Sequence, residues 1–253
     1  AFFGYHYGPW AGIFGAVLMG VVAGAIHALA TVIFGVDHIV SGVAVNLLGA
    51  GAGAYLAVRT FSNLPDGGPT QSPPLKLLPF LSVPGVGDPL LSLEQSHTWL
   101  VADIAGILRA MTTNVNVLTI IAVVLLVLSW WLLWRTPFGL RLRSCGEAPQ
   151  AAETLGINVI KFKFVAVLIS GGLAGLAGGF LVLVASNLYR EGQTGGRGYI
   201  GLAAMIFGNW RPGGLGGAAA LFGYADAIQL RGRGDVIHAY LLPLGVLLLA
   251  WGV

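Results

Sequence analysis

Charged residues are scarce in this chain. Thirteen basic and ten acidic residues make up 9% of its 253 residues, whereas a soluble domain carries about a quarter. Hydrophobic residues make up 56%, and the mean hydropathy is +0.83. This composition excludes a soluble globular enzyme and a disordered tail, and it indicates a protein that lies in a lipid bilayer.

Cysteine and several catalytic motifs are also lacking. The single cysteine, Cys145, excludes a disulfide framework and a cysteine metal cluster. The phosphate-binding pattern G-x-x-x-x-G-K-[ST] is absent, so any ATPase is expected on another chain. H-E-x-x-H, C-x-x-C and G-x-S-x-G are absent too, so zinc hydrolase, redox and serine hydrolase functions have no support. We expect no metal, cofactor or catalytic residue on this chain, and no nucleic-acid partner, because the basic residues are few and scattered.

The start of the chain is apolar. No basic segment precedes the first apolar run, so a cleavable signal peptide is not expected. Because the chain starts at Ala1 inside apolar sequence, we expect a processed or truncated N-terminus.

Long uncharged windows predict membrane-spanning helices, since a helix needs about 20 mostly apolar residues to cross the hydrocarbon. These windows are continuously apolar, which excludes the alternating strands of a β-barrel. The two windows around Arg211 are shorter than a full span. We therefore predict an all-α fold, a polytopic transmembrane helix bundle with short broken or re-entrant helices near the C-terminus. The predicted spans, in a single domain over residues 1–253, are 9–34, 38–58, 112–134, 162–186, 198–210, 214–230 and 236–253.

The distribution of basic residues predicts the orientation. Five of the thirteen lie in the segment from Arg135 to Lys163, and basic residues in short loops favour the cytoplasmic side. Residues 135–160 are therefore expected in the cytoplasm. Residues 59–109 are expected outside, as a proline-rich, irregular loop, with a short interfacial helix over 99–109.

The cytoplasmic loop contains a helix signal. Pro149 suits the first turn of a helix, good helix formers follow it, and Gly156 suits the C-terminal stop. Such a short amphipathic helix either docks in a groove of another protein or rests at the lipid headgroups, and the pattern alone leaves both open. We also expect Cys145, the only thiol, to be accessible from the cytoplasm.

Polar and small residues inside the spans have both structural and functional interpretations. His27, alone in an apolar run, is expected to be a hydrogen-bonded packing residue, while Asp37 with His38 would be candidates if the chain were an intramembrane enzyme. Glycines four residues apart are expected to pack helices together within the chain. They are Gly20 with Gly24, Gly49 with Gly53, and the run Gly171, Gly175 and Gly179.

Four motifs carry a resemblance. The runs T-P-F-G-L-R-L-R (136–143) and G-E-A-P-Q-A-A-E-T-L-G-I-N (146–158) resemble the coupling loop of permease subunits of ABC importers of the ribose and branched-chain amino acid type. The runs V-D-H-I-V-S-G-V-A-V-N-L-L (36–48) and I-F-G-N-W-R-P-G (206–213) are most similar to the nucleoside, or simple sugar, permeases. Family members carry further N-terminal spans, so the spans here correspond to roughly the fourth to the tenth.

The resemblance implies a membrane-spanning permease subunit without its own ATPase site, in the plasma (inner) membrane of a bacterium or archaeon. It implies cytoplasmic ATP-binding subunits, a second permease subunit forming a homo- or heterodimer, and an extracytoplasmic substrate-binding protein. A sugar or branched-chain amino acid permease, an intramembrane enzyme and a channel are the alternatives to nucleoside transport. The residues expected to couple to the ATPase are Gly146, Glu147, Pro149, Ala151, Ala152, Glu153, Leu155 and Gly156.

A substrate path is expected along two segments. Gly- and Pro-interrupted short helices are typical of transporter substrate paths, because they leave backbone groups free to meet ligand or water. Asn46 places an amide inside an uncharged span, where lipid would leave it unsatisfied, so it should face protein or an aqueous path. An interhelical hydrogen bond is the alternative role. The residues assigned to the path are Ser41, Asn46, Phe207 and Asn209.

Overall fold

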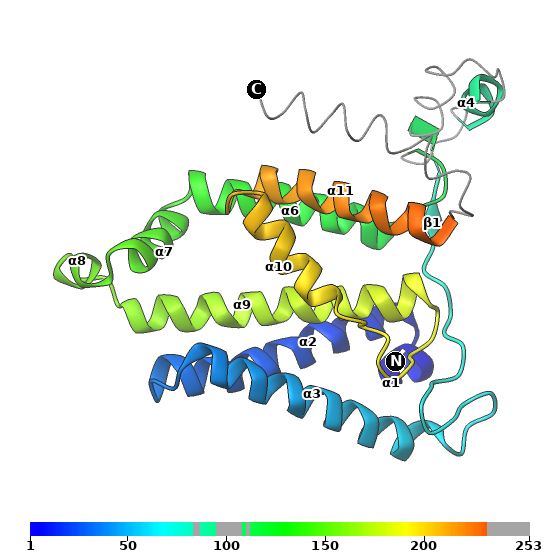
Figure 1. Cartoon of the computed structure of the whole chain (residues 1–253), viewed down its shortest axis with the longest axis horizontal. Coiled ribbons are helices and arrows are strands. Elements are labelled where there is room, and N and C mark those ends of the chain that lie inside the picture. The colour runs from blue at the N-terminus through cyan, green and yellow to red at the C-terminus, as the bar shows by residue number, and fades with distance from the viewer. Residues whose placement is uncertain (83–86, 95–107, 110–111, 232–253) are drawn as a thin grey trace. The chain divides into compact units, whose positions relative to one another are not determined.

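The computed structural model describes residues 1–82, 87–94, 108–109 and 112–231 (Figure 1). The chain divides into two compact units, Ala1–Gly195 and Gly196–Val253, and the second is described up to residue 231. The expected span 236–253 and nearly all of the expected helix over 99–109 lie outside the described residues.

Helices build both units. In the described ranges the strands are the two-residue antiparallel pair β1 (Phe80–Leu81) and β2 (Val115–Asn116). The first unit contains, in chain order, α1 (Phe2–Tyr7), α2 (Pro9–Ala28), the π-helical turn η1 (Leu29–Ile33), α3 (His38–Phe61), α4 (Gly87–Glu94), α6 (Val117–Arg135), α7 (Pro137–Glu147), α8 (Pro149–Thr154), α9 (Val159–Phe180) and the π-helical turn η2 (Leu181–Ala185).

Four helical segments of the first unit are long and apolar enough to cross a membrane. They have 25, 24, 19 and 27 residues, and their bounds are Pro9–Ile33, His38–Phe61, Val117–Arg135 and Val159–Ala185. Many of their large apolar side chains are exposed in the isolated chain, as expected for helices surrounded by lipid. The chain is therefore an all-α polytopic membrane protein.

Side-chain caps determine where three of these segments begin. The carboxylate of Asp37 accepts hydrogen bonds from two backbone N–H groups of α3, at 2.8 and 3.1 Å. The amide oxygens of Asn116 and Asn158 each accept one at 2.9 Å, in α6 and α9. Such caps satisfy N–H groups that a helix start leaves unpaired. They explain why α6 begins at Val117 instead of residue 112, and α9 at Val159 instead of residue 162.

Glycines bring α2 and α9 into direct backbone contact. A Cβ atom built on Gly20 would lie 2.7 Å from the Cα atom of Gly175, and one on Gly24 would lie 3.2 Å from the Cα atom of Gly171. Later residues of α2 thus face earlier residues of α9, so the two helices are antiparallel. The expectation that glycines pack helices within the chain is confirmed for these residues. It is wrong for Gly49, where a Cβ atom would meet no other described helix within 4 Å.

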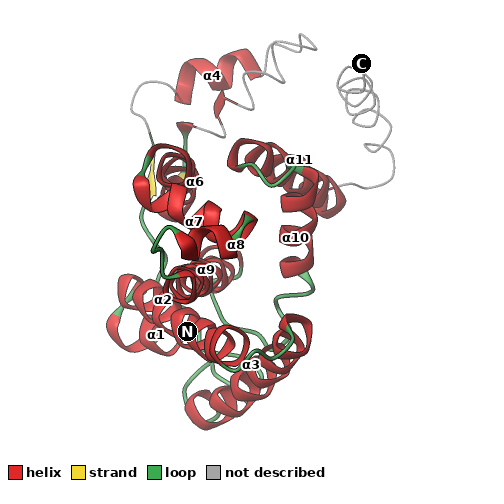
Figure 2. Cartoon of the chain, turned by 90° about the vertical axis from the view of Figure 1, so that its left-hand side faces the viewer, coloured by secondary structure: helices red, strands yellow, loops and turns green. Residues whose placement is uncertain are grey.

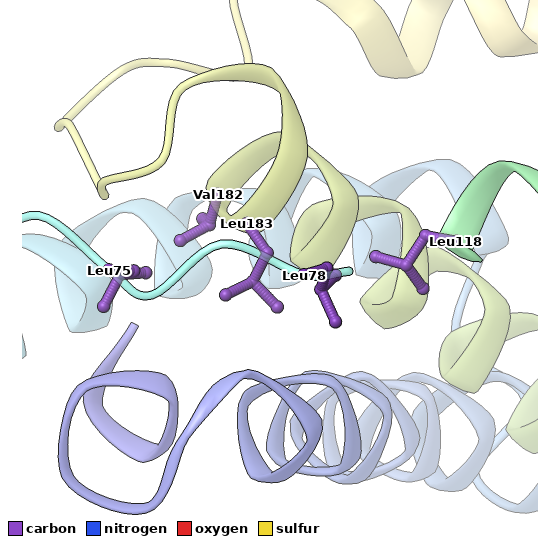
Figure 3. Packing of buried hydrophobic residues seen from close by; sticks show 5 residues of the cluster. All are labelled: Leu75, Leu78, Leu118, Val182 and Leu183. Carbon is purple, nitrogen blue, oxygen red and sulfur yellow. The ribbon is translucent and has the colours of Figure 1, made fainter. Parts of the chain in front are cut away.

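The proline-rich segment after α3 packs against the end of α9. Two of its leucines, Leu75 and Leu78, form a buried cluster with Leu118 of α6 and with Val182 and Leu183 of η2 (Figure 3). This cluster is the larger apolar core of the first unit. It lies at the end of α9 that is opposite to α8.

Hydrogen bonds attach the same segment to the chain that follows η2. The Ser72 hydroxyl accepts from the backbone N–H of Tyr189, and the Ser72 N–H donates to the Tyr189 carbonyl, both at 2.9 Å. The N–H of Leu75 donates to the carbonyl of Asn187 at 2.8 Å. Burial raises the pKa of the Tyr189 phenol, and the nearby charge of Glu191 raises it further. These hydrogen bonds thus hold the proline-rich segment against the loop after η2, although the two are far apart in sequence.

The second unit contains a hairpin of two helices, α10 (Arg197–Phe207) and α11 (Pro212–Arg231). With 11 residues, α10 is much shorter than a full span, as the broken window around Arg211 predicts. A Cβ atom on Gly208 would clash with the backbone of Gly214, so the turn depends on glycine for its close return.

Candidate coupling loop and substrate path

The loop between α6 and α9 folds into two short helices. The Thr136 hydroxyl accepts a hydrogen bond from the Gly139 N–H at 3.2 Å and caps α7, whose first residue is Pro137. A Cβ atom on Gly139 would lie 2.5 Å from the Cα atom of Leu133, so glycine allows α7 to fold back against the end of α6. Only one helix was expected in this loop and α7 was missed, although Thr136 followed by Pro137 is a helix-start signal.

The second helix of the loop, α8, begins at Pro149 and ends at Thr154, as the proline and glycine signals predict. Gly156 follows with φ of 78°, a left-handed conformation that glycine adopts without steric cost. Figure 2 shows α7 and α8 in front of the ends of α6 and α9.

A small buried cluster holds α7, α8 and α9 together. Cys145, Ala152 and Val159 are 1%, 2% and 4% exposed, and Ile157 and Phe162 pack around them. The small side chain of Ala152 is therefore required by packing inside the chain. A docked partner is not needed to explain it. The expectation that Cys145 is an accessible thiol is wrong, because its sulfur is enclosed in this cluster.

The other residues assigned to coupling lie on the surface of the loop. Leu155 is 80% exposed, the highest value among the large apolar side chains of the described residues, and it directly follows α8. Pro149 is half-buried at the start of α8. Exposed coupling residues besides Leu155 are Gly146, Glu147, Ala151, Glu153 and Gly156. The structure thus brings seven of the eight together on an accessible surface.

Ser41, the first residue assigned to the substrate path, is used inside the chain. Its hydroxyl lies 2.9 Å from Nδ1 of His27, and the side chain is 5% exposed. This bond joins α2 to α3 and confirms that His27 is a hydrogen-bonded packing residue. Ser41 therefore has a packing role, and its assignment to the path stays a prediction.

Asn46 lies on a different face of α3. Five residues rotate a helix by about 500°, which leaves Ser41 and Asn46 about 140° apart. Asn46 is exposed, and its side chain has no hydrogen-bond partner among the described residues. Gly42 and Gly49 lie about one turn before and after it, and apart from the adjoining backbone of α3 no described atom would come within 4 Å of a Cβ atom on either. This face of α3 is open around a single amide.

Phe207 and Asn209 lie in the second unit. The ring of Phe207 meets that of Phe222 edge to face, 6.1 Å between centroids, which joins α10 to α11. Asn209 has φ of 52° and Trp210 has φ of 59°. Asparagine tolerates the left-handed region, whereas a bulky aromatic there is uncommon. Asn209 thus has a conformational role in the turn, and its side chain is exposed.

A family comparison accounts for this combination of spans and loop. The sequence model of one protein family, described as the permease component of the branched-chain amino acid transport system, matches residues 2–251. The chain belongs to this permease family.

Three relatives illustrate the range of the family. The permease is 35% identical to the guanosine ABC transporter permease NupQ of Bacillus subtilis over 95% of this chain and 72% of NupQ. It is 34% identical to the nucleoside ABC transporter permease NupC of Lactococcus lactis, over 88% of this chain and 64% of NupC. It is 32% identical over 88% of its length to TsgC13 of Haloferax volcanii, whose name assigns it to glucose transport, and covers 61% of that protein. The permease therefore spans about two thirds of the length of these relatives. No solved structure matches it significantly.

The ends of the first unit differ in charge. Because α2 is antiparallel to α9, the α2–α3 turn lies at the same end as α7 and α8 (Figure 1). That end also carries the basic residues at positions 135, 141, 143, 161 and 163. The opposite end of this permease carries the proline-rich segment and the loop after η2.

Proposed function

We propose that this permease is the membrane-spanning subunit of an ATP-driven importer and forms part of the path for a nucleoside-like solute. The observation that carries the substrate class is the 35% identity to the guanosine permease NupQ over 95% of the chain. The open face around Asn46 is compatible with a nucleoside, because an uncharged amide can pair with hydroxyl and ring-nitrogen groups.

The basic end of the first unit faces the cytoplasm in this proposal. Short loops rich in lysine and arginine are retained on that side, and five of the thirteen basic residues are here. The proline-rich segment then lies outside, where it can meet a substrate-binding protein.

The loop of α7 and α8 couples the permease to a cytoplasmic ATP-binding subunit. Leu155 offers an exposed apolar side chain, and Glu147 and Glu153 place carboxylates near it on the same loop. An apolar contact with a charged rim is a common arrangement in protein interfaces. ATP is bound and hydrolysed by the partner, and the rigid cluster around Cys145 transmits the movement of the loop to α9.

A second permease subunit, identical or different, completes the path. Substrate crosses between the two subunits as ATP binding and hydrolysis alternate access to each side. Asn46 lies on the part of α3 that nothing in the described chain covers, which supports a position at this boundary.

Substrate competition in cells tests the proposed solute class. A strain without this gene should lose uptake of labelled guanosine, and restoring the gene should return it. Excess unlabelled nucleoside should compete, while glucose and leucine should not. Competition by glucose alone would instead favour a sugar permease, the function in the name of TsgC13.

A further inference from the structure

Two arginine side chains lie against two tryptophan rings at the basic end of α6. The guanidinium carbon of Arg135 is 5.8 Å from the ring centroid of Trp130, and that of Arg143 is 5.2 Å from the ring centroid of Trp134. The two tryptophans are four residues apart, so they occupy the same face of α6. One arginine comes from α6 and the other from α7, so the tertiary fold brings both to this face.

The tryptophan side chains and Arg135 are exposed, and Arg143 is half-buried. Trp130 is 45% exposed and Trp134 is 38% exposed, and the neighbouring Trp131 is 51% exposed. Tryptophan is enriched where a membrane span meets the headgroups, because its ring is apolar and its N–H is polar. The last turns of α6 have this composition.

The charges on this face are not neutralised within the described part of the chain. No carboxylate there lies within salt-bridge distance of Arg135 or Arg143, and the Nε–H of Arg143 is buried without a hydrogen-bond acceptor. Stacking on a ring occupies the flat face of a guanidinium but leaves its two terminal nitrogens free to donate, and these match two oxygens of a phosphate.

We infer that the surface formed by Trp130, Trp134, Arg135 and Arg143 binds the headgroup of an anionic phospholipid. An anionic lipid provides phosphate oxygens for the guanidinium edges and acyl chains for the exposed tryptophan rings. The leaflet in which it lies follows from the proposed orientation, but the binding itself does not depend on transport. We name this surface the Trp–Arg surface.

A lipid fits this surface better than an acidic face of the ATP-binding subunit. The arginines lie on tryptophans of an apolar span, whereas the exposed coupling residues lie beyond Arg143, between Gly146 and Gly156. A protein partner on the Trp–Arg surface would have to enter the headgroup region.

Native mass spectrometry of the purified chain tests the inference. The protein is titrated with phosphatidylglycerol or with phosphatidylcholine of the same acyl chains, and bound lipid is counted. We expect tighter binding of phosphatidylglycerol. The double variant Arg135→Gln/Arg143→Gln should lose about fivefold in that preference for each guanidinium removed, from about 1 kcal/mol per basic residue at an anionic surface.

Two further variants separate charge from geometry. Arg143→Lys keeps the charge but not the paired N–H edge, so it should also weaken binding, and it covers the case in which the double variant does not fold. Arg190→Gln removes one exposed positive charge at the opposite end of the first unit and should leave the preference unchanged.

Three results would overturn the inference. The first is an unchanged lipid preference in the folded double variant. The second is an equal loss in Arg190→Gln, which would indicate a general charge effect. The third is a double variant that loses the copurifying ATP-binding subunit while its lipid binding stays intact. This result would assign the Trp–Arg surface to a protein contact.

Discussion

Nδ1 of His27 lies 2.9 Å from the hydroxyl of Ser41, and this contact joins α2 to α3 near the basic end of the first unit. Both groups are polar and lie within apolar spans, where an unpaired group is costly. The bond gives each of them a partner. Their pairing depends on the π-helical turn η1 and the short connection to Asp37, which bring the two helices together.

Removal of this bond should lower stability more than transport. Ser41→Ala is expected to cost about 0.6 kcal/mol, the average for interhelical hydrogen bonds in membrane proteins. Ser129→Ala is the matched control, because the Ser129 hydroxyl donates to the Leu125 carbonyl of its own helix. Thermal unfolding in nanodiscs measures both. Loss of uptake in Ser41→Ala at unchanged stability would show instead that Ser41 acts on the substrate path.

A tryptophan placed on α8 should have different effects at the adjacent positions Ala151 and Ala152. Ala152→Trp overfills the cluster with Cys145 and Val159, at a cost of about 1–3 kcal/mol, and should expose the Cys145 thiol to maleimide. Ala151→Trp lies on the exposed side of α8 and should leave that thiol protected while blocking ATPase association. Normal ATPase association in Ala151→Trp would refute the proposed docking surface.

Accessible single cysteines should report the orientation. The native thiol is unsuitable because Cys145 is 1% exposed. In a Cys145→Ala background, Leu155→Cys should react with a membrane-impermeant maleimide only in inverted vesicles. Arg190→Cys, which is exposed at the other end of the first unit, should react only in intact cells. The reverse pattern would invert the proposed topology.

The glycine interface between α2 and α9 should not tolerate a methyl group. In Gly175→Ala the new Cβ would lie 2.9 Å from the Cα atom of Gly20, so the helices must separate, at a cost of about 1–3 kcal/mol. Gly178→Ala, on the same helix, places its methyl group where no described atom beyond the adjoining backbone of α9 lies within 4 Å. Thermal unfolding should therefore separate the two variants, and equal midpoints would show that the interface adapts.

The amide of Asn46 should be needed for uptake of the solute and not for folding of the chain. Asn46→Leu keeps the branched shape of the side chain but removes its hydrogen-bonding groups, so nucleoside uptake should fall while complex assembly and basal ATP hydrolysis remain. Val43→Leu, an apolar change at an exposed position of the same helix, is the control. Dissociation of the complex in Asn46→Leu would instead identify a contact with the second permease subunit.

Much of the fold was predictable from local sequence. Scarce charge and long apolar windows identified the helical membrane protein, because each span must satisfy its backbone groups by itself. Pro149 and Gly156 marked the limits of the short cytoplasmic helix, since both act through local backbone geometry. The four motifs were sufficient to indicate the permease family, because they are short runs of adjacent residues.

The environment of single side chains was decided only by the tertiary structure. Ser41 and Asn46 are five residues apart and both polar, yet only the packing of α2 determines which one is covered. From the sequence, the small side chain of Ala152 fits either a contact with a docked partner or packing inside the chain. The structure decides for packing, because Cys145 and Val159 enclose it. The meeting of Arg143 with Trp134 depends on the fold of α7 back onto α6 at Gly139. Sequence periodicity determines the face of a helix on which a residue lies. The burial and the hydrogen-bond partners of its side chain depend on which other helix packs against that face.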